Sequence, residues 1–209
     1  MRHGLLPSKR LGAVASTLVL TVFGSAAGVA ADTHGSPGTL TFVVKDGPLV
    51  LAPAAVRDGT PVDGIPPGPM VEGGYHIHAH LAVFVNGVQA WIPAGVGVTR
   101  PLELDPHRND PAITGAKGFY WLHTHDESGV IHAEAPQEHA FTLGQFFDMW
   151  GQPLSRQRVG PATGAVKVLV DGKPFLGEPR TLVLRQHQVI QLNVGQDVEF
   201  QPYDFPSFL

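Results

Sequence analysis

Residues 75–93, YHIHAHLAVFVNGVQAWIP, constrain the fold more than any other stretch of the chain, because two β-prone runs meet there at Asn-Gly. Successive side chains on a β-strand point to opposite faces. Asn-Gly between two such runs is the strongest short-range signal of a hairpin. The stretch therefore predicts a strand, a two-residue turn and a return strand.

Other parts of the chain repeat this design. GFYWLHTH, the turn DESG and VIHAEA predict a second hairpin, AVKVLVDGKPF predicts a third around Asp-Gly, and TLVLRQHQVIQLNVG predicts further strand. Residues 99–117 are expected to form a polar loop. The abundant glycine (25) and proline (19), with only 15% charged residues, also favour short strands and tight turns.

One helix is expected, in FTLGQFFDMWG, residues 141–151. Thr142 and Gln145 have the spacing of a capping box, and Gly151 is placed to end the helix in a left-handed conformation. We therefore predict a mainly β fold, an antiparallel sandwich or small barrel of hairpins with one short helix at about 142–150.

Four segments are expected along the chain. Residues 1–31 have the basic, apolar and small-residue regions of an export signal, and an uncleaved membrane anchor is the alternative. Residues 32–74 are expected to hold an N-terminal strand at 39–47 and a Pro/Gly-rich loop or linker. A single β-rich domain at 75–200 and a tail at 201–209 follow. The location is then periplasmic or extracellular, with membrane anchoring if the signal is not cleaved.

The net charge and the absence of cysteine exclude some classes of partner and of metal ligand. Removing the three basic residues of the signal changes the formal net charge from −4 to −7, which argues against nucleic acid as a partner. The chain has no cysteine, so neither a disulfide nor a thiolate metal ligand is available. No membrane contact beyond the signal segment is expected, and no protein partner is indicated.

The histidines fall on one face of the first predicted strand. Ile77, Ala79 and Leu81 would form an apolar face for the core, whereas His76, His78 and His80 would share the other. Neighbouring members of such a row are about 6.6 Å apart. We therefore expect two of the three to bind one ion, with the third nearby as a supporting group or proton carrier.

The second hairpin brings three more histidines to one face. If residues 126–129 form its turn, His125 pairs with Val130, His123 with His132, and Trp121 with Glu134. Cross-strand Cβ atoms lie about 5 Å apart, which allows two imidazoles to bind one ion. A bulge in the turn would shift this register by one residue.

These patterns together predict a transition-metal site. The candidate ligands all carry imidazole: His76, His78, His80, His123, His125 and His132. Glu134 is the candidate base, ligand or supporting carboxylate. Copper and zinc are the first candidates for the ion, with iron or nickel as further ones. The alternative is a histidine-rich surface that responds to pH.

YHIHAHLAVFVNG, FYWLHTHDESGVIHAEAP and FTLGQFFDMWG together resemble an uncharacterised family of exported bacterial and archaeal proteins, over roughly residues 61–195. The resemblance implies one domain and a shared set of histidines, and it carries no activity. It also implies a cysteine in many relatives at the position of Gly118, so any role of that thiol is missing from this chain.

Three functions remain open from the sequence. The first is an exported transition-metal-binding protein that serves in acquisition, storage or resistance. The second is a metalloenzyme in which three histidines hold zinc, iron or copper with an open position that activates water or oxygen. The third is a structural β-domain that a metal merely stabilises.

Overall fold

The computed structural model of the chain describes residues 49–70, 74–108 and 112–209. The predicted export signal and the strand predicted at 39–47 lie outside these ranges. Within them, no helix has both the length and the apolar character needed to cross a bilayer.

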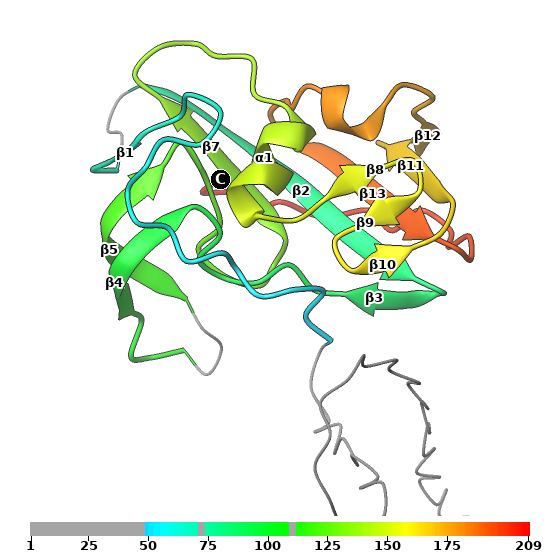
Figure 1. Cartoon of the computed structure of the whole chain (residues 1–209), viewed down its shortest axis with the longest axis horizontal. Helices are drawn as coiled ribbons and strands as arrows, with labels where there is room; N and C mark the ends of the chain where they lie inside the picture. The colour runs from blue at the N-terminus through cyan, green and yellow to red at the C-terminus, as the bar shows by residue number, and fades with distance from the viewer. Residues whose placement is uncertain (1–48, 71–73, 109–111) are drawn as a thin grey trace, which may run out of the picture. The chain divides into compact units, whose positions relative to one another are not determined.

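The largest sheet has seven strands (Figure 1). It carries His76, His78, His80, His123 and His132. Its order is β12 (Lys173–Pro174), β11 (Val166–Val170), β13 (Gln188–Val194), β2 (Tyr75–Val85), β7 (Val130–Ala135) and β6 (Leu122–His123), with β3 (Val88–Ala90) on the far half of β2. The three predicted hairpins account for most of its antiparallel pairs. The sheet is nevertheless mixed, because β13 runs parallel to β2.

Two three-stranded sheets accompany it. One has the order β1 (Pro67–Gly68), β5 (Ile113–Tyr120), β4 (Val98–Leu104), and the other β10 (Ala162–Thr163), β9 (Arg158–Val159), β8 (Leu154–Ser155). The polar loop predicted at 99–117 is therefore wrong, since β4 and much of β5 occupy it. The mainly β fold with one short α-helix is confirmed, and in the described residues no sheet closes into a barrel.

The helix α1 (Leu143–Trp150) begins and ends as the sequence predicts. Thr142 Oγ1 accepts from the backbone N–H of Gln145 at 3.2 Å, and Gln145 Oε1 accepts from the backbone N–H of Thr142 at 2.9 Å. Gly151 ends the helix at φ 75°. A short 3₁₀ helix, η1 (Pro179–Thr181), packs beside α1.

Helix α1 covers the apolar face of the large sheet, in front of β2 and β7 in Figure 1. Phe146, Phe147 and Trp150 of α1 are fully buried in one core with Leu81 and Val83 of β2. The alternation of β2 thus works as predicted, because its odd-numbered residues meet the helix and its even-numbered residues point away from it.

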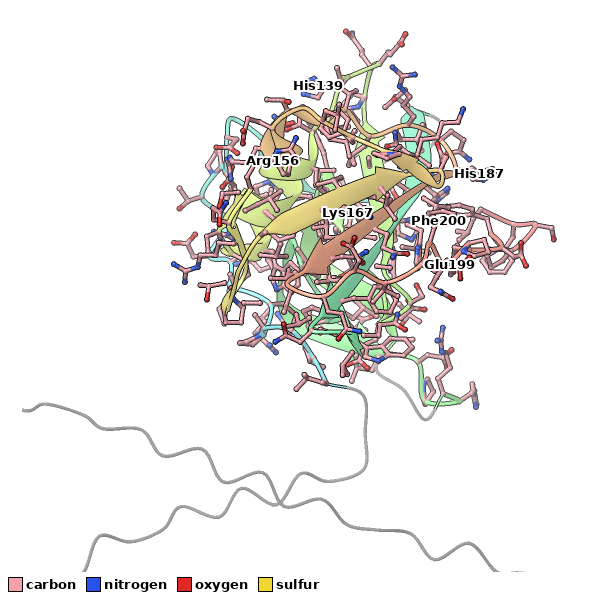
Figure 2. All side chains as sticks on the ribbon, turned by 90° about the vertical axis from the view of Figure 1, so that its right-hand side faces the viewer. His139, Arg156, Lys167, His187, Glu199 and Phe200 are labelled. Atoms are coloured by element: carbon pink, nitrogen blue, oxygen red, sulfur yellow. The ribbon has the colours of Figure 1, made fainter. Side chains whose placement is uncertain are left out.

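The C-terminal segment packs beside β13 (Figure 2). Asn193 Nδ2 donates to the carbonyl of Val198 at 2.8 Å, and Gln191 Oε1 accepts from the backbone N–H of Gln201 at 2.8 Å. Both side chains on β13 are buried. They therefore satisfy their amides by binding the backbone of the segment that follows.

Candidate metal centre

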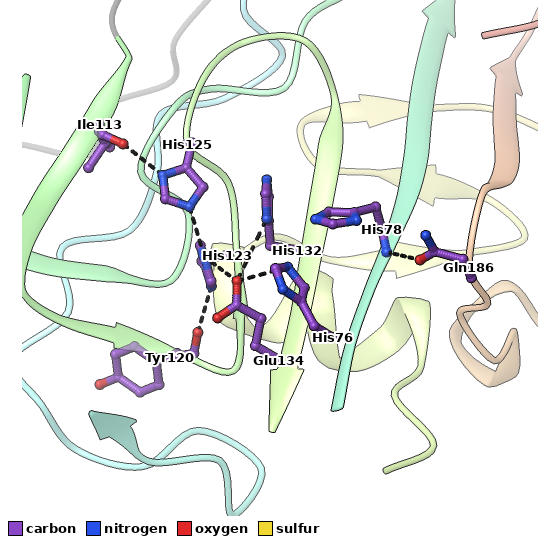
Figure 3. Close-up of polar contacts among 9 residues, drawn as sticks. All are labelled: His76, His78, Ile113, Tyr120, His123, His125, His132, Glu134 and Gln186. Atoms are coloured by element: carbon purple, nitrogen blue, oxygen red, sulfur yellow. Dashed lines mark hydrogen bonds and ion pairs between the residues drawn. The ribbon is translucent and has the colours of Figure 1, made fainter. Parts of the chain in front are cut away.

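A row of histidines crosses three neighbouring strands on the sheet face away from α1 (Figure 3). His78 on β2 lies opposite His132 on β7, and His132 lies opposite His123 on β6. The ring centroids are 4.6 Å apart for the first pair and 5.3 Å for the second. The predicted pairing of His123 with His132 is thus confirmed, and His78 extends the same row.

The predicted pairing of His125 with Val130 is wrong, because β6 ends at His123. Val130 pairs with His80 instead, and the carbonyl of His125 accepts from the backbone N–H of Ile113 on β5. His125 therefore lies in the segment after β6 and contacts β5. Its imidazole still reaches the cluster, since His125 Nε2 lies 3.1 Å from His123 Nε2.

Backbone carbonyls fix the protonation of these two rings. His123 Nδ1 lies 2.9 Å from the carbonyl oxygen of Tyr120, and His125 Nδ1 lies 2.7 Å from that of Ile113. A carbonyl only accepts, so each Nδ1 carries the proton and donates it. In a neutral imidazole the other nitrogen is then an acceptor, which leaves a lone pair on each Nε2.

Two lone pairs therefore face each other across the 3.1 Å between His123 Nε2 and His125 Nε2. A hydrogen bond between them would need one of the two rings to be charged. Burial lowers the pKa of His123 to about 3, with His132 and His125 adding to the effect, so His123 itself stays neutral at pH 7. His123 is 1% exposed. A metal cation bound by both nitrogens removes this conflict and needs no protonation.

His78 and His132 are also short of partners. Among the described residues, both ring nitrogens of His78 and Nδ1 of His132 are buried without a hydrogen bond. Burial lowers the pKa of both rings, that of His78 to about 4. Buried polar atoms in native proteins are nearly always paired. Three such atoms in one cluster are compatible with a bound metal ion, although Nδ1 of His80, beside the cluster, is unpaired as well.

Glu134 supplies a buried negative charge inside the cluster. Its Oε1 lies 3.1 Å from His76 Nε2, 3.6 Å from His123 Nε2 and 3.7 Å from His132 Nδ1. Burial opposes this charge, but the surrounding imidazoles outweigh it and lower the pKa of Glu134 to about 2. At neutral pH the cluster thus combines a carboxylate with buried neutral rings, which favours a cation.

His80 is used differently from its neighbours. Its Nε2 donates to the carbonyl of Ser128 at 3.0 Å, and its ring stacks on Tyr203 with centroids 3.8 Å apart. Gly129 makes this approach possible, because a Cβ there would lie 2.5 Å from the carbonyl oxygen of Leu81. His80 therefore lies beside the cluster as a supporting residue of the β6–β7 turn.

Phe119 forms an apolar wall of the cluster. Its ring packs on two of the imidazoles, with centroids 5.1 Å from His123 and 5.5 Å from His125. Trp121 packs on His139 and Phe141. Phe119 lies in β5, most of which had been expected to be loop. No sequence signal connects Tyr203 with His80.

Asp126 belongs to the turn rather than to the ligand set. It accepts from the backbone N–H of Ser128 at 3.0 Å and pairs with Arg108 at 3.1 Å. These contacts outweigh the opposing effect of burial and lower its pKa. The backbone carbonyls of Tyr120 and Ile113, rather than Asp126, orient the rings of His123 and His125.

Five of the six predicted ligands form two overlapping groups. In each group the candidate ligand atoms lie within 4.8 Å of one another: His76, His78 and His132 in the first, and His123, His125 and His132 in the second. These residues fit a transition metal because they offer imidazole nitrogens and unpaired buried atoms. Comparisons with known protein families, with curated proteins and with solved structures found no match to this chain.

Proposed function

We propose that the protein binds a transition-metal ion through the histidines of β2, β6 and β7 and that it serves, after export, in metal acquisition, storage or resistance. The facing Nε2 lone pairs of His123 and His125 carry this proposal, since a cation resolves their conflict. The pattern of residues 1–31 supports export, and so does the resemblance to exported proteins.

The chemistry of the donors supports copper or zinc first. Imidazole suits Zn²⁺, Cu²⁺, Ni²⁺ and Fe²⁺, whereas Mg²⁺ and Ca²⁺ prefer oxygen ligands. The chain has no cysteine that would favour Cu⁺ through thiolate. Two nitrogens bound to one ion at about 2.0–2.1 Å lie roughly 3 Å apart, close to the separation of His123 Nε2 and His125 Nε2.

The proposal is tested by metal analysis of the untagged full chain after loading with Zn²⁺ or Cu²⁺ and removal of free ion. We expect at least one ion per chain, and a strong loss of retained metal in His123→Ala and His125→Ala. His107→Ala, an exposed histidine in a separate turn, is the matched control. Wild-type protein that retains no more metal than a histidine-free protein of similar size would overturn the proposal.

Glu134 gives a specific reason to keep a metalloenzyme as the second candidate. Its Oε1 lies 3.6 Å from His123 Nε2, close enough to accept a proton from a water bound next to the ligands. Zinc held there would supply an acidified water. Metal-loaded Glu134→Gln that keeps its ion but loses hydrolytic activity on a panel of activated esters would favour the enzyme. No activity in the loaded wild type would favour the binding protein.

A further inference from the structure

The two ligand groups share His132 and both approach Glu134. His123 and His125 stand on one side of His132, and His76 and His78 on the other (Figure 3). Ring centroids place His132 4.6 Å from both His78 and His125. The cluster is thus two pairs of imidazoles with one imidazole between them, rather than a single ring of ligands.

His132, like His78, has a buried ring nitrogen without a hydrogen bond among the described residues. His123 and His125 each donate Nδ1 to a carbonyl, but in the described residues neither ring nitrogen of His132 has a hydrogen bond. Its Nδ1 approaches Glu134 Oε1 at 3.7 Å, a weak contact that lowers the pKa of Glu134 and that a metal ion could replace. Both nitrogens of His132 are therefore free to bind metal.

Glu134 touches both sides of this arrangement. Its Oε1 is 3.1 Å from His76 Nε2 in one group and 3.6 Å from His123 Nε2 in the other. The carboxylate is 2% exposed, and its cross-strand partner is His76. A buried negative charge between two sets of neutral ligands is what two neighbouring cations need, because it reduces their mutual repulsion.

We propose that the site holds two divalent transition-metal ions at once, one on His123 and His125 and the other on His76 and His78, with His132 and Glu134 as the shared ligands. This inference rests on the proposed function. To bind both ions, His132 uses both ring nitrogens, so its remaining ring proton leaves to solvent when the second ion enters. The imidazolate and the carboxylate together then offset two of the four positive charges.

The test is a Cu²⁺ titration of the untagged full chain, followed by metal analysis and electron paramagnetic resonance. We expect two retained copper ions per chain. The integrated signal per copper should fall at least twofold on adding the second equivalent, because two spins couple through a shared imidazolate. His76→Ala, whose side chain is 41% exposed, should lose one ion and keep an uncoupled signal from the other.

The outcomes separate this inference from the proposed function. One copper per chain, unchanged in His76→Ala and His78→Ala, overturns the second position and leaves the proposed function standing. Two coppers with full signal per ion overturn the sharing of His132. No retained copper overturns both. His132→Ala should abolish the coupling, whereas His107→Ala, outside the cluster, should match the wild type in stoichiometry and signal.

Discussion

The two faces of β2 are both buried, but the side chains on them find different kinds of partner. On one face Ala79, Leu81 and Val83, between 0% and 1% exposed, meet the aromatic side chains of α1. On the other, His78 and His80 are each 6% exposed, and neither ring nitrogen of His78 has a hydrogen-bond partner within the part of the chain that the structure describes. Apolar packing satisfies the first face completely, whereas the second still has donor atoms to satisfy.

One strand thus serves two purposes. The face toward α1 stabilises the fold by removing apolar surface from water. The histidine face buries polar atoms, which costs stability unless these atoms form hydrogen bonds or bind a metal ion. The first face should therefore control the stability of the metal-free protein, and the second should control how that stability responds to metal and to pH.

Truncation on the apolar face should have the largest effect. Leu81→Ala leaves a cavity under α1 and should lower the free energy of unfolding of the metal-free protein by about 2–5 kcal/mol, measured by urea denaturation. Val88→Ala, at a position 60% exposed, is the matched control and should change it by about 0.5 kcal/mol or less. A loss below about 1 kcal/mol for Leu81→Ala would contradict the assignment of this face to the core.

Metal should act only through the histidine face. Zn²⁺ at a free concentration one hundred times its Kd should raise the free energy of unfolding by about 2.7 kcal/mol. Calorimetry should show the same gain in Leu81→Ala but none in His123→Ala. Equal stabilisation of both variants would mean that the ion binds elsewhere.

Acid should weaken the metal-free protein through the same face. The pKa values of His78 and His123, about 4 and about 3, lie below the value of 6.5 for an exposed histidine. The unfolded chain thus binds more protons in this range, so stability is full above pH 6.5 and falls as the pH drops towards 4. Between pH 7 and pH 5, the free energy of unfolding of His78→Ala should fall by about 1–2 kcal/mol less than that of the wild type.

Urea denaturation at the two pH values measures this difference. Leu81→Ala is the matched comparison, because it should keep the pH dependence of the wild type at a lower overall stability. Parallel curves for the wild type and His78→Ala would contradict the neutral, buried state of His78.

The contact at the edge of the histidine face should have the smallest effect. Tyr203→Ala removes the ring stacked on His80 and should lower the free energy of unfolding by about 1 kcal/mol. The number of bound metal ions should not change, since His80 belongs to neither ligand group. Loss of an ion in Tyr203→Ala, measured by metal analysis, would place the C-terminal segment in the site itself.

Local patterns predicted much of this structure. The Asn-Gly and Asp-Gly turns, the capping box of Thr142 and the row of His123 and His132 all depend on residues close in sequence, where turn and cap chemistry decides the outcome. The alternation of β2 predicted the face of each histidine, because period two holds wherever a strand is regular.

The pairing of strands that are distant in sequence could not be predicted from local patterns. No local signal shows that β13 lies parallel to β2, or that His125 joins β5 through Ile113 instead of continuing along β7. The strand β4 was not predicted, because it is exposed along much of its length and its polar residues resemble those of a loop. The contact between Tyr203 and His80 depends on where the C-terminal segment docks, which the amides of Gln191 and Asn193 decide.

The parallel pairing of β2 with β13 has a consequence for the order of assembly. His80 lies opposite Val189, so the ligand strand gains its second neighbour only when nearly all of the chain has emerged. Chains emerge N-terminus first, and contacts between distant residues form slowly. We therefore expect the histidine hairpins to form before β13 pairs with β2, so that one edge of β2 stays open until late in folding.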